Sequence, residues 1–219
     1  MVITIDGPAA SGKSSTAKAV AEALAFRHVD SGSLYRAVTA ARARLGGPSD
    51  RWTEGEVLAA AGTVSLEPVA CGFEPRVGGL AADTELRGSA VTSSVARVAQ
   101  LPGVRLWVNS RVRLAADHHD VVVDGRDMGT AVFPAADLKI YLIADPWHRA
   151  RRRLLERERR EPFEGQILEE MEIIERRDAR DAAQSVPAAD AVVIDTSEIA
   201  QEEQVARIVA LAEALRRRA

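Results

Sequence analysis

The sequence predicts an α/β protein whose central parallel sheet is covered by helices. Short apolar runs of strand length, rich in Val and Ile, alternate along the chain with charged stretches of helical spacing. Strands buried on both faces of a parallel sheet have such near-continuous apolar runs, because neither face meets water. With 219 residues, the chain can form one sizeable core with a small insertion, whereas two full domains would be cramped.

The first strand is expected in "MVITID", a β-branched run that a glycine ends. The stretch "SSTAKAVAEALA" follows, with Ala17, Val20, Ala21 and Leu24 at helical spacing. Strand, glycine loop and helix therefore open the chain in this order. Further buried strands are expected in the runs "DVVVDG", "LKIYLIAD" and "AVVIDT".

Residues 62–88 have a different pattern, rich in Gly and Pro with short alternating pieces, which predicts an inserted set of small antiparallel strands. From His148 onward the pattern predicts a helix, a polar break at Pro162 to Gly165, and a second helix. The amphipathic C-terminal stretch ends in arginines, which suit the C-terminus of a helix.

The composition argues against several classes of protein. A net charge of -3 does not suit a protein that mainly neutralises nucleic-acid phosphate, and no apolar run approaches a membrane-spanning length. The single cysteine, Cys71, cannot form an internal disulfide, and "MVITIDG" lacks the basic lead and apolar core of a signal peptide. We therefore expect a cytoplasmic protein without nucleic-acid or membrane partners.

The loop after the first strand fits G-x-x-x-x-G-K-[ST], a pattern whose glycines let successive backbone N–H groups surround phosphates. The helix that follows adds its positive N-terminus. Lys13 would reach the β and γ phosphates, and a hydroxyl from Ser14 or Ser15 would face Mg²⁺. A glycine turn that merely joins strand to helix is the alternative. The predicted nucleotide-binding loop comprises Gly7, Pro8, Ala9, Ala10, Ser11, Gly12, Lys13, Ser14 and Ser15.

This loop predicts a three-layer P-loop NTPase fold, but it does not decide which biochemical function the protein has. The guanine-reading N-K-x-D element of GTP switches is absent, because Asn109 is the only asparagine. An acidic pair after an apolar strand, found in many ATPases, is absent too. A kinase for a small acceptor is the class that fits best, and it needs an acceptor site.

Two segments offer arginines and hydroxyls on rigid turns, which is what an acceptor phosphate and sugar need. In "HVDSGSLYRAV", Ser31 opens a helix, and Tyr35 and Arg36 lie on its first turns, although a simple helix cap would look the same. In "VVVDGRDMGTAVFP", Arg126 and Asp127 follow a strand end, where the carboxyl ends of parallel strands form a ligand crevice.

The motifs "IDGPAASGKSS", "DSGSLYR", "LPGVR", "DGRDMGTAVFP" and "RRDARD" occur in the order seen in bacterial cytidylate kinases. The sequence resembles this family over almost its whole length, and the fourth motif is far more particular than a P-loop. The resemblance implies an enzyme that uses ATP and Mg²⁺ to phosphorylate CMP or dCMP by direct in-line transfer. We expect a monomer.

The resemblance also implies roles for single residues. In the family pattern Arg36 and Arg126 hold the acceptor phosphate, with Ser31 nearby, and Arg105 and Asp127 read the cytosine edge. This is chemically sensible, because a carboxylate accepts from the exocyclic amine of cytosine and an arginine donates to its carbonyl and ring nitrogen.

Residues Arg177 and Asp181 match positions that contact the sugar in the family, although spaced four apart they could simply form an ion pair on a helix. Asp124 resembles a carboxylate that orients Mg²⁺ through water. Three arginines in the first of the two later helices resemble residues that fold over the transferring phosphoryl group, although alone they would suit a solvated helix face. These are Arg149, Arg152 and Arg153.

The family organisation implies three regions in one P-loop kinase unit. These are a core at about residues 1–30, 106–147 and 186–219, an acceptor-binding region at about 31–105 with its insert at about 62–88, and a lid at about 148–184.

Two departures from the family pattern are visible. Ala96 stands where a serine is common, and Gln184 where an arginine is common. Two other functions stay open: a P-loop kinase for another small acceptor such as UMP, and a nucleotide-binding regulatory protein that hydrolyses slowly.

Overall fold

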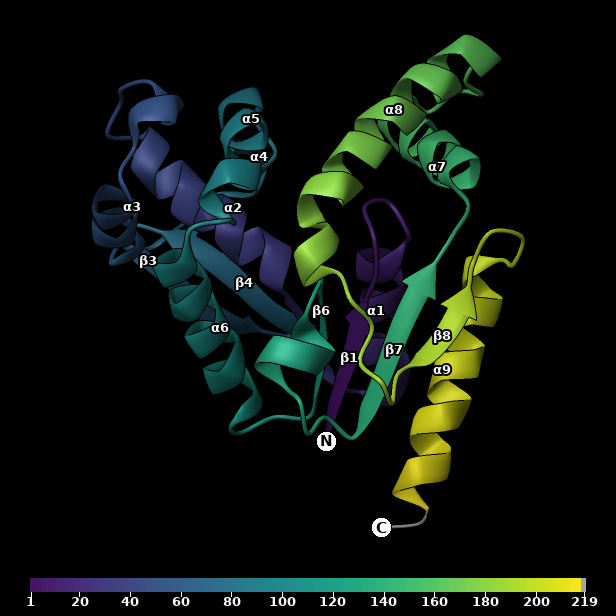
Figure 1. Cartoon of the computed structure of the whole chain (residues 1–219). Helices are drawn as coiled ribbons and strands as arrows, with labels where there is room; N and C mark the ends of the chain where they lie inside the picture. Colours follow the sequence, from purple (N-terminus) through teal and green to yellow (C-terminus); the bar gives the residue numbers. More distant parts are fainter. Residues whose placement is uncertain (218–219) are drawn as a thin grey trace. The chain divides into compact units, whose positions relative to one another are not determined.

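The computed structural model describes residues 1–217 (Figure 1). The chain divides into two compact units: the first combines residues 1–26 with the segment from Val122 onward, and the second comprises residues 27–121. Among residues 1–217, no helix is both long enough and apolar enough to cross a membrane.

The sheet of the first unit has the strand order β6-β1-β7-β8. Strand β1 pairs in parallel with β7, and β7 pairs in parallel with β8, so the predicted parallel sheet is confirmed. Each strand coincides with an apolar run in the sequence. The bounds are β1 (Val2–Asp6), β6 (Val121–Gly125), β7 (Leu138–Ile143) and β8 (Val192–Asp195).

Helix α1 (Lys13–Leu24) follows the glycine loop and packs against α9 (Gln201–Arg216), which in turn contacts β7 (Figure 1). The apolar side of α1, including Val20 and Leu24, meets residues of β1, β7 and α9 in one buried cluster. This core fixes the end of β1 and the start of α1, and therefore the ends of the loop between them.

Helices α7 (Pro146–Glu158) and α8 (Glu164–Asp181) pack against each other in the first unit. Asp145 caps α7, because its carboxylate accepts from the backbone N–H of Trp147 at 2.9 Å. The break between the two helices comprises residues 159–163, so it begins and ends earlier than the expected break at Pro162 to Gly165. Helix α8 begins at Glu164, because the side chain of Gln166 accepts from the N–H of Phe163 at 3.0 Å and closes the first turn.

The first unit also contains two short helical segments, a π-helical turn η2 (Met128–Val132) after β6 and a 3-10 turn η3 (Ala182–Gln184) after α8.

In the second unit the residues between 62 and 88 form the expected antiparallel strands, with β3 pairing with β4 and β4 with β5. Strand β4 also pairs in parallel with β2, with Gly72 opposite His28, a contact that the sequence pattern did not predict. Helix α2 packs against α3, α5 and α6. The bounds are β2 (Arg27–Asp30), α2 (Ser31–Ala43), η1 (Ser49–Arg51), α3 (Glu54–Ala61), β3 (Val64–Val69), β4 (Gly72–Val77), β5 (Leu80–Ala81), α4 (Asp83–Leu86), α5 (Ser89–Val98) and α6 (Pro102–Ala116).

Candidate active site

The glycine loop joins β1 to α1, and its first and last glycines are required by its shape. A Cβ atom on Gly7 would lie 2.4 Å from the carbonyl oxygen of Leu142, so no larger residue fits there. Gly12 precedes α1 with a φ of 85°, a left-handed conformation that glycine adopts without steric cost. The loop therefore runs tightly over the end of the sheet and leads into the N-terminus of α1, where backbone N–H groups attract anions.

The two serines at the start of α1 have different partners. The hydroxyl of Ser14 donates to a carboxylate oxygen of Asp124, at the end of β6, over 2.5 Å. The hydroxyl of Ser15 instead donates to the carbonyl of Gly12 at 2.9 Å. Ser14 and Asp124 together offer a hydroxyl and a carboxylate, which are oxygen donors of the kind that Mg²⁺ prefers. Ser14 is therefore the better candidate for a metal ligand.

Lys13, the first residue of α1, curls back over the loop, and its ammonium group donates to the carbonyl of Pro8 at 3.0 Å. The positive charge of Lys13 therefore lies beside the loop backbone that is expected to surround the phosphates.

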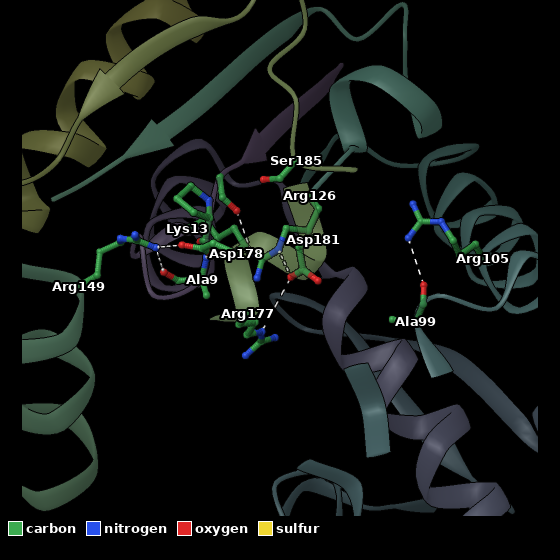
Figure 2. Close-up of polar contacts among 12 residues, drawn as sticks. Ala9, Lys13, Ala99, Arg105, Arg126, Arg149, Arg177, Asp178, Asp181 and Ser185 are labelled. Carbon is green, nitrogen blue, oxygen red and sulfur yellow. Dashed lines mark hydrogen bonds and ion pairs between the residues drawn. The ribbon is translucent and has the colours of Figure 1, made fainter. Parts of the chain in front are cut away.

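Arg126 lies against the loop and against α8 (Figure 2). Its Nη1 donates to the carbonyl of Gly7 at 2.7 Å, and its Nε donates to the carboxylate of Asp181 at 3.0 Å. The guanidinium of Arg177 approaches the same carboxylate at 4.0 Å. The structure therefore brings together three of the residues that were expected to bind the acceptor.

Asp6, at the end of β1, is a site residue that the sequence reasoning missed. Its buried carboxylate accepts from the backbone N–H groups of Met128 at 2.9 Å and of Gly129 at 2.8 Å. These bonds fix the backbone immediately after Arg126 and Asp127. Asp127 itself is buried. The available signal was an aspartate directly before the first glycine of the loop, where an apolar strand would not need one.

Burial raises the pKa of Asp6 from 3.8 to about 6, against the opposing effect of its two backbone hydrogen bonds. A carboxyl group whose pKa is higher in the folded than in the unfolded protein contributes fully to stability at pH values below its pKa in the unfolded state. That contribution is lost as pH rises through its pKa in the folded state. The advantage in unfolding free energy of the wild type over Asp6→Asn should therefore fall by about 1 kcal/mol between pH 5 and pH 7. Urea titrations of both proteins measure this, and a difference that stays constant with pH would contradict the assignment.

The three arginines expected in the lid all lie on α7 but have different partners. Arg149 is buried and donates to the carbonyl of Ala9 at 2.9 Å. Arg152 donates to the carbonyl of Ser197 at 3.2 Å and lies beside Gly12 of the loop. Arg153 pairs with the buried Glu170 of α8 at 3.2 Å.

Four expected acceptor residues lie in the second unit. Ser31 is the buried first residue of α2, and Tyr35 is buried on the same helix. The guanidinium of Arg36 donates to the carbonyl of Leu86 at 3.0 Å. Arg105, on α6, donates to the carbonyl of Ala99 at 3.3 Å (Figure 2).

No group of three or more His, Cys, Asp or Glu side chains in the described part of the chain could hold a metal ion. A magnesium site for a nucleotide needs fewer protein ligands, because phosphate oxygens and water complete its shell.

The parallel sheet, the glycine loop at the N-terminus of α1 and the pair formed by Ser14 and Asp124 define a P-loop nucleotide-binding protein. Comparison with known proteins makes this more specific. The chain belongs to the cytidylate kinase family, whose family model, described as cytidylate kinase, matches residues 3–214.

Curated relatives agree with this family over nearly their full lengths. A protein named cytidylate kinase from Rhodopseudomonas palustris is 39% identical, with 99% of this chain and 97% of the relative covered. One of the same name from Thermus thermophilus is 44% identical, with 95% and 97% covered. An uncharacterised protein from Eubacterium ventriosum shares the fold, with a TM-score of 0.54 at 12% identity and 97% and 98% coverage.

Proposed function

We propose that this chain transfers the γ-phosphoryl group of ATP to CMP or dCMP, giving ADP and the corresponding diphosphate. The observation that carries the proposal is the phosphate loop, with Ser14 bonded to Asp124 at one end and Arg126 bonded to Gly7 at the other. Relatives named cytidylate kinase support the choice of acceptor.

Backbone N–H groups of the loop and the ammonium of Lys13 would bind the donor phosphates. Ser14 and Asp124 are the residues that would hold Mg²⁺, which supplies positive charge at the donor phosphates when bound. Their contact in the structure supports this pairing.

For the acceptor we propose the residues that the family pattern implies. Arginine forks would bind the phosphate, a carboxylate and an arginine would read the base, and an ion pair on α8 would contact the sugar. Arg36 and Arg126, together with Ser31 and Tyr35, would bind the phosphate. Asp127 and Arg105 would read the base, and Arg177 and Asp181 would contact the sugar.

Transfer needs no covalent intermediate, because positioning and charge stabilisation supply most of the catalysis of phosphoryl transfer. Lys13 and Arg126 are proposed to act there together with the three arginines of α7. Closure of the proposed lid, residues 148–184, would exclude water as a competing acceptor. The division into core, acceptor-binding region and lid stays a prediction, as do the cytoplasmic location, the monomeric state and the absence of nucleic-acid or membrane partners.

A panel of acceptors tests this function. Under one Mg-ATP condition, CMP and dCMP should stimulate ADP release, whereas UMP and AMP should be poorer acceptors. Uracil lacks the exocyclic amine that cytosine would offer to the buried Asp127, so UMP should be used about 10- to 100-fold less efficiently. Equal use of UMP would favour a kinase for another acceptor, and ADP release that no acceptor stimulates would favour a regulatory nucleotide-binding protein.

A further inference from the structure

The backbone of Ala9, in the middle of the phosphate loop, is held on both sides by charged side chains of α7 and α8 (Figure 2). Its N–H donates to one carboxylate oxygen of Asp178 at 2.9 Å. Its carbonyl accepts from Nη1 of Arg149 at 2.9 Å. The same Nη1 also donates to the second carboxylate oxygen of Asp178. One carboxylate, one guanidinium and one loop residue therefore form a closed network.

The side chain of Ala9 joins the same pair of helices. It is 2% exposed and lies in an apolar cluster formed by α7 and α8. The other buried members of this cluster are Ala150, Leu154, Ile167 and Ile174. Ala9 is thus anchored to the two helices through its N–H, its carbonyl and its side chain, so a shift of either helix would move the middle of the loop.

Ala10, the next residue, has a backbone conformation that needs support from its surroundings. Ala10 has a φ of 57°, in the left-handed region where an L residue with a Cβ atom is strained. Strained backbone persists only where the surrounding structure holds it. The fixed backbone of Ala9 supplies this support on one side, and the rigid start of α1 supplies it on the other.

We propose that Asp178 is a positioning residue for donor binding, which holds the backbone of Ala9 and keeps the phosphate loop in the shape that receives a triphosphate. The inference rests on the proposed function of this loop as the donor site. Asp178 acts through the loop. It couples the loop to α8, as Asp181 does one turn further along through Arg126 and Gly7.

The variant Asp178→Asn tests the proposal, because it keeps the size of the side chain but replaces one acceptor oxygen by an NH₂ donor, which then faces either the N–H of Ala9 or the guanidinium of Arg149. The Kd for Mg-ATP, measured by calorimetry below the unfolding temperature, should rise about tenfold or more, because a small misplacement of the loop is costly. The KM for CMP should stay within about twofold, since acceptor contacts are unchanged. Hydrogen exchange of the Ala9 amide should become faster.

Glu172→Gln is the matched control. Glu172 is an exposed carboxylate on the same helix that pairs with Arg176, so its loss should leave the Kd for Mg-ATP at the wild-type value.

The outcomes separate this inference from the function on which it rests. Wild-type protein that does not bind Mg-ATP would overturn the donor site, and this inference with it. Wild-type binding together with an unchanged Kd in folded Asp178→Asn would overturn the inference alone. If Asp178→Asn does not fold, Asp178→Glu takes its place. It keeps the charge for Arg149 but displaces the carboxylate by one methylene group, and an unchanged Kd for Mg-ATP would again overturn the inference.

Discussion

Replacing Lys13 with alanine is expected to abolish phosphorylation of CMP, with kcat falling by about 1000-fold or more. The ammonium of Lys13 is the charge that the phosphate loop brings to the donor, and backbone N–H groups alone cannot neutralise a triphosphate. The side chain is only partly buried and contacts the carbonyl of Pro8. The variant should therefore keep its circular dichroism spectrum. A coupled assay for ADP with CMP as acceptor measures the loss.

Lys18→Ala is the control for this variant. Lys18 lies on the exposed side of the same helix, so its replacement removes an equal charge away from the loop and should leave kcat unchanged. Substantial activity in folded Lys13→Ala would count against the loop as the donor site.

Replacing Arg126 with alanine should lower kcat/KM for CMP by about 100- to 1000-fold. Its guanidinium is held between Gly7 and Asp181, with a planar fork of donors that suits a phosphate. Arg126→Lys keeps the charge but loses the fork, so it should recover only part of the activity. Steady-state kinetics with varied CMP measure both variants.

Arg176→Ala supplies the comparison, because Arg176 is an exposed arginine of α8 that pairs with Glu172. Its loss should leave kcat/KM for CMP near the wild-type value. If folded Arg126→Ala also keeps the wild-type kcat/KM for CMP, Arg126 does not bind the acceptor phosphate.

The strands, the phosphate loop and the family could be predicted because each depends on residues that are close together in the sequence. Apolar runs mark the parallel strands, and the glycine pattern marks the turn into α1. The contact between Ser14 and Asp124 is consistent with the expectation that both face Mg²⁺, and it distinguishes Ser14 from Ser15, which the pattern could not. The roles proposed for the individual site residues stay predictions.

The supporting contacts could not be predicted, because they join residues that only the tertiary structure brings together. Asp6 bonds to the N–H groups of Met128 and Gly129, and Asp178 bonds to the N–H of Ala9. Neither spacing follows a helical or strand period, so no local pattern reveals these contacts.

The partners of the arginines of α7 could not be predicted from the sequence either. Their spacing places them near one another on the helix, but it does not say what each one meets. Arg149 contacts the loop, Arg152 contacts backbone carbonyls after β8, and Arg153 contacts Glu170 of α8. Partners on other elements decide the direction of each guanidinium.

In the proposed function, this chain moves a phosphoryl group from ATP directly to a pyrimidine nucleoside monophosphate. The most direct measurement follows the label from ATP labelled at the γ-phosphate in the presence of CMP and Mg²⁺. One labelled phosphate should appear in CDP for every ADP formed, with little inorganic phosphate. Label released as inorganic phosphate at a rate that CMP does not change would contradict it.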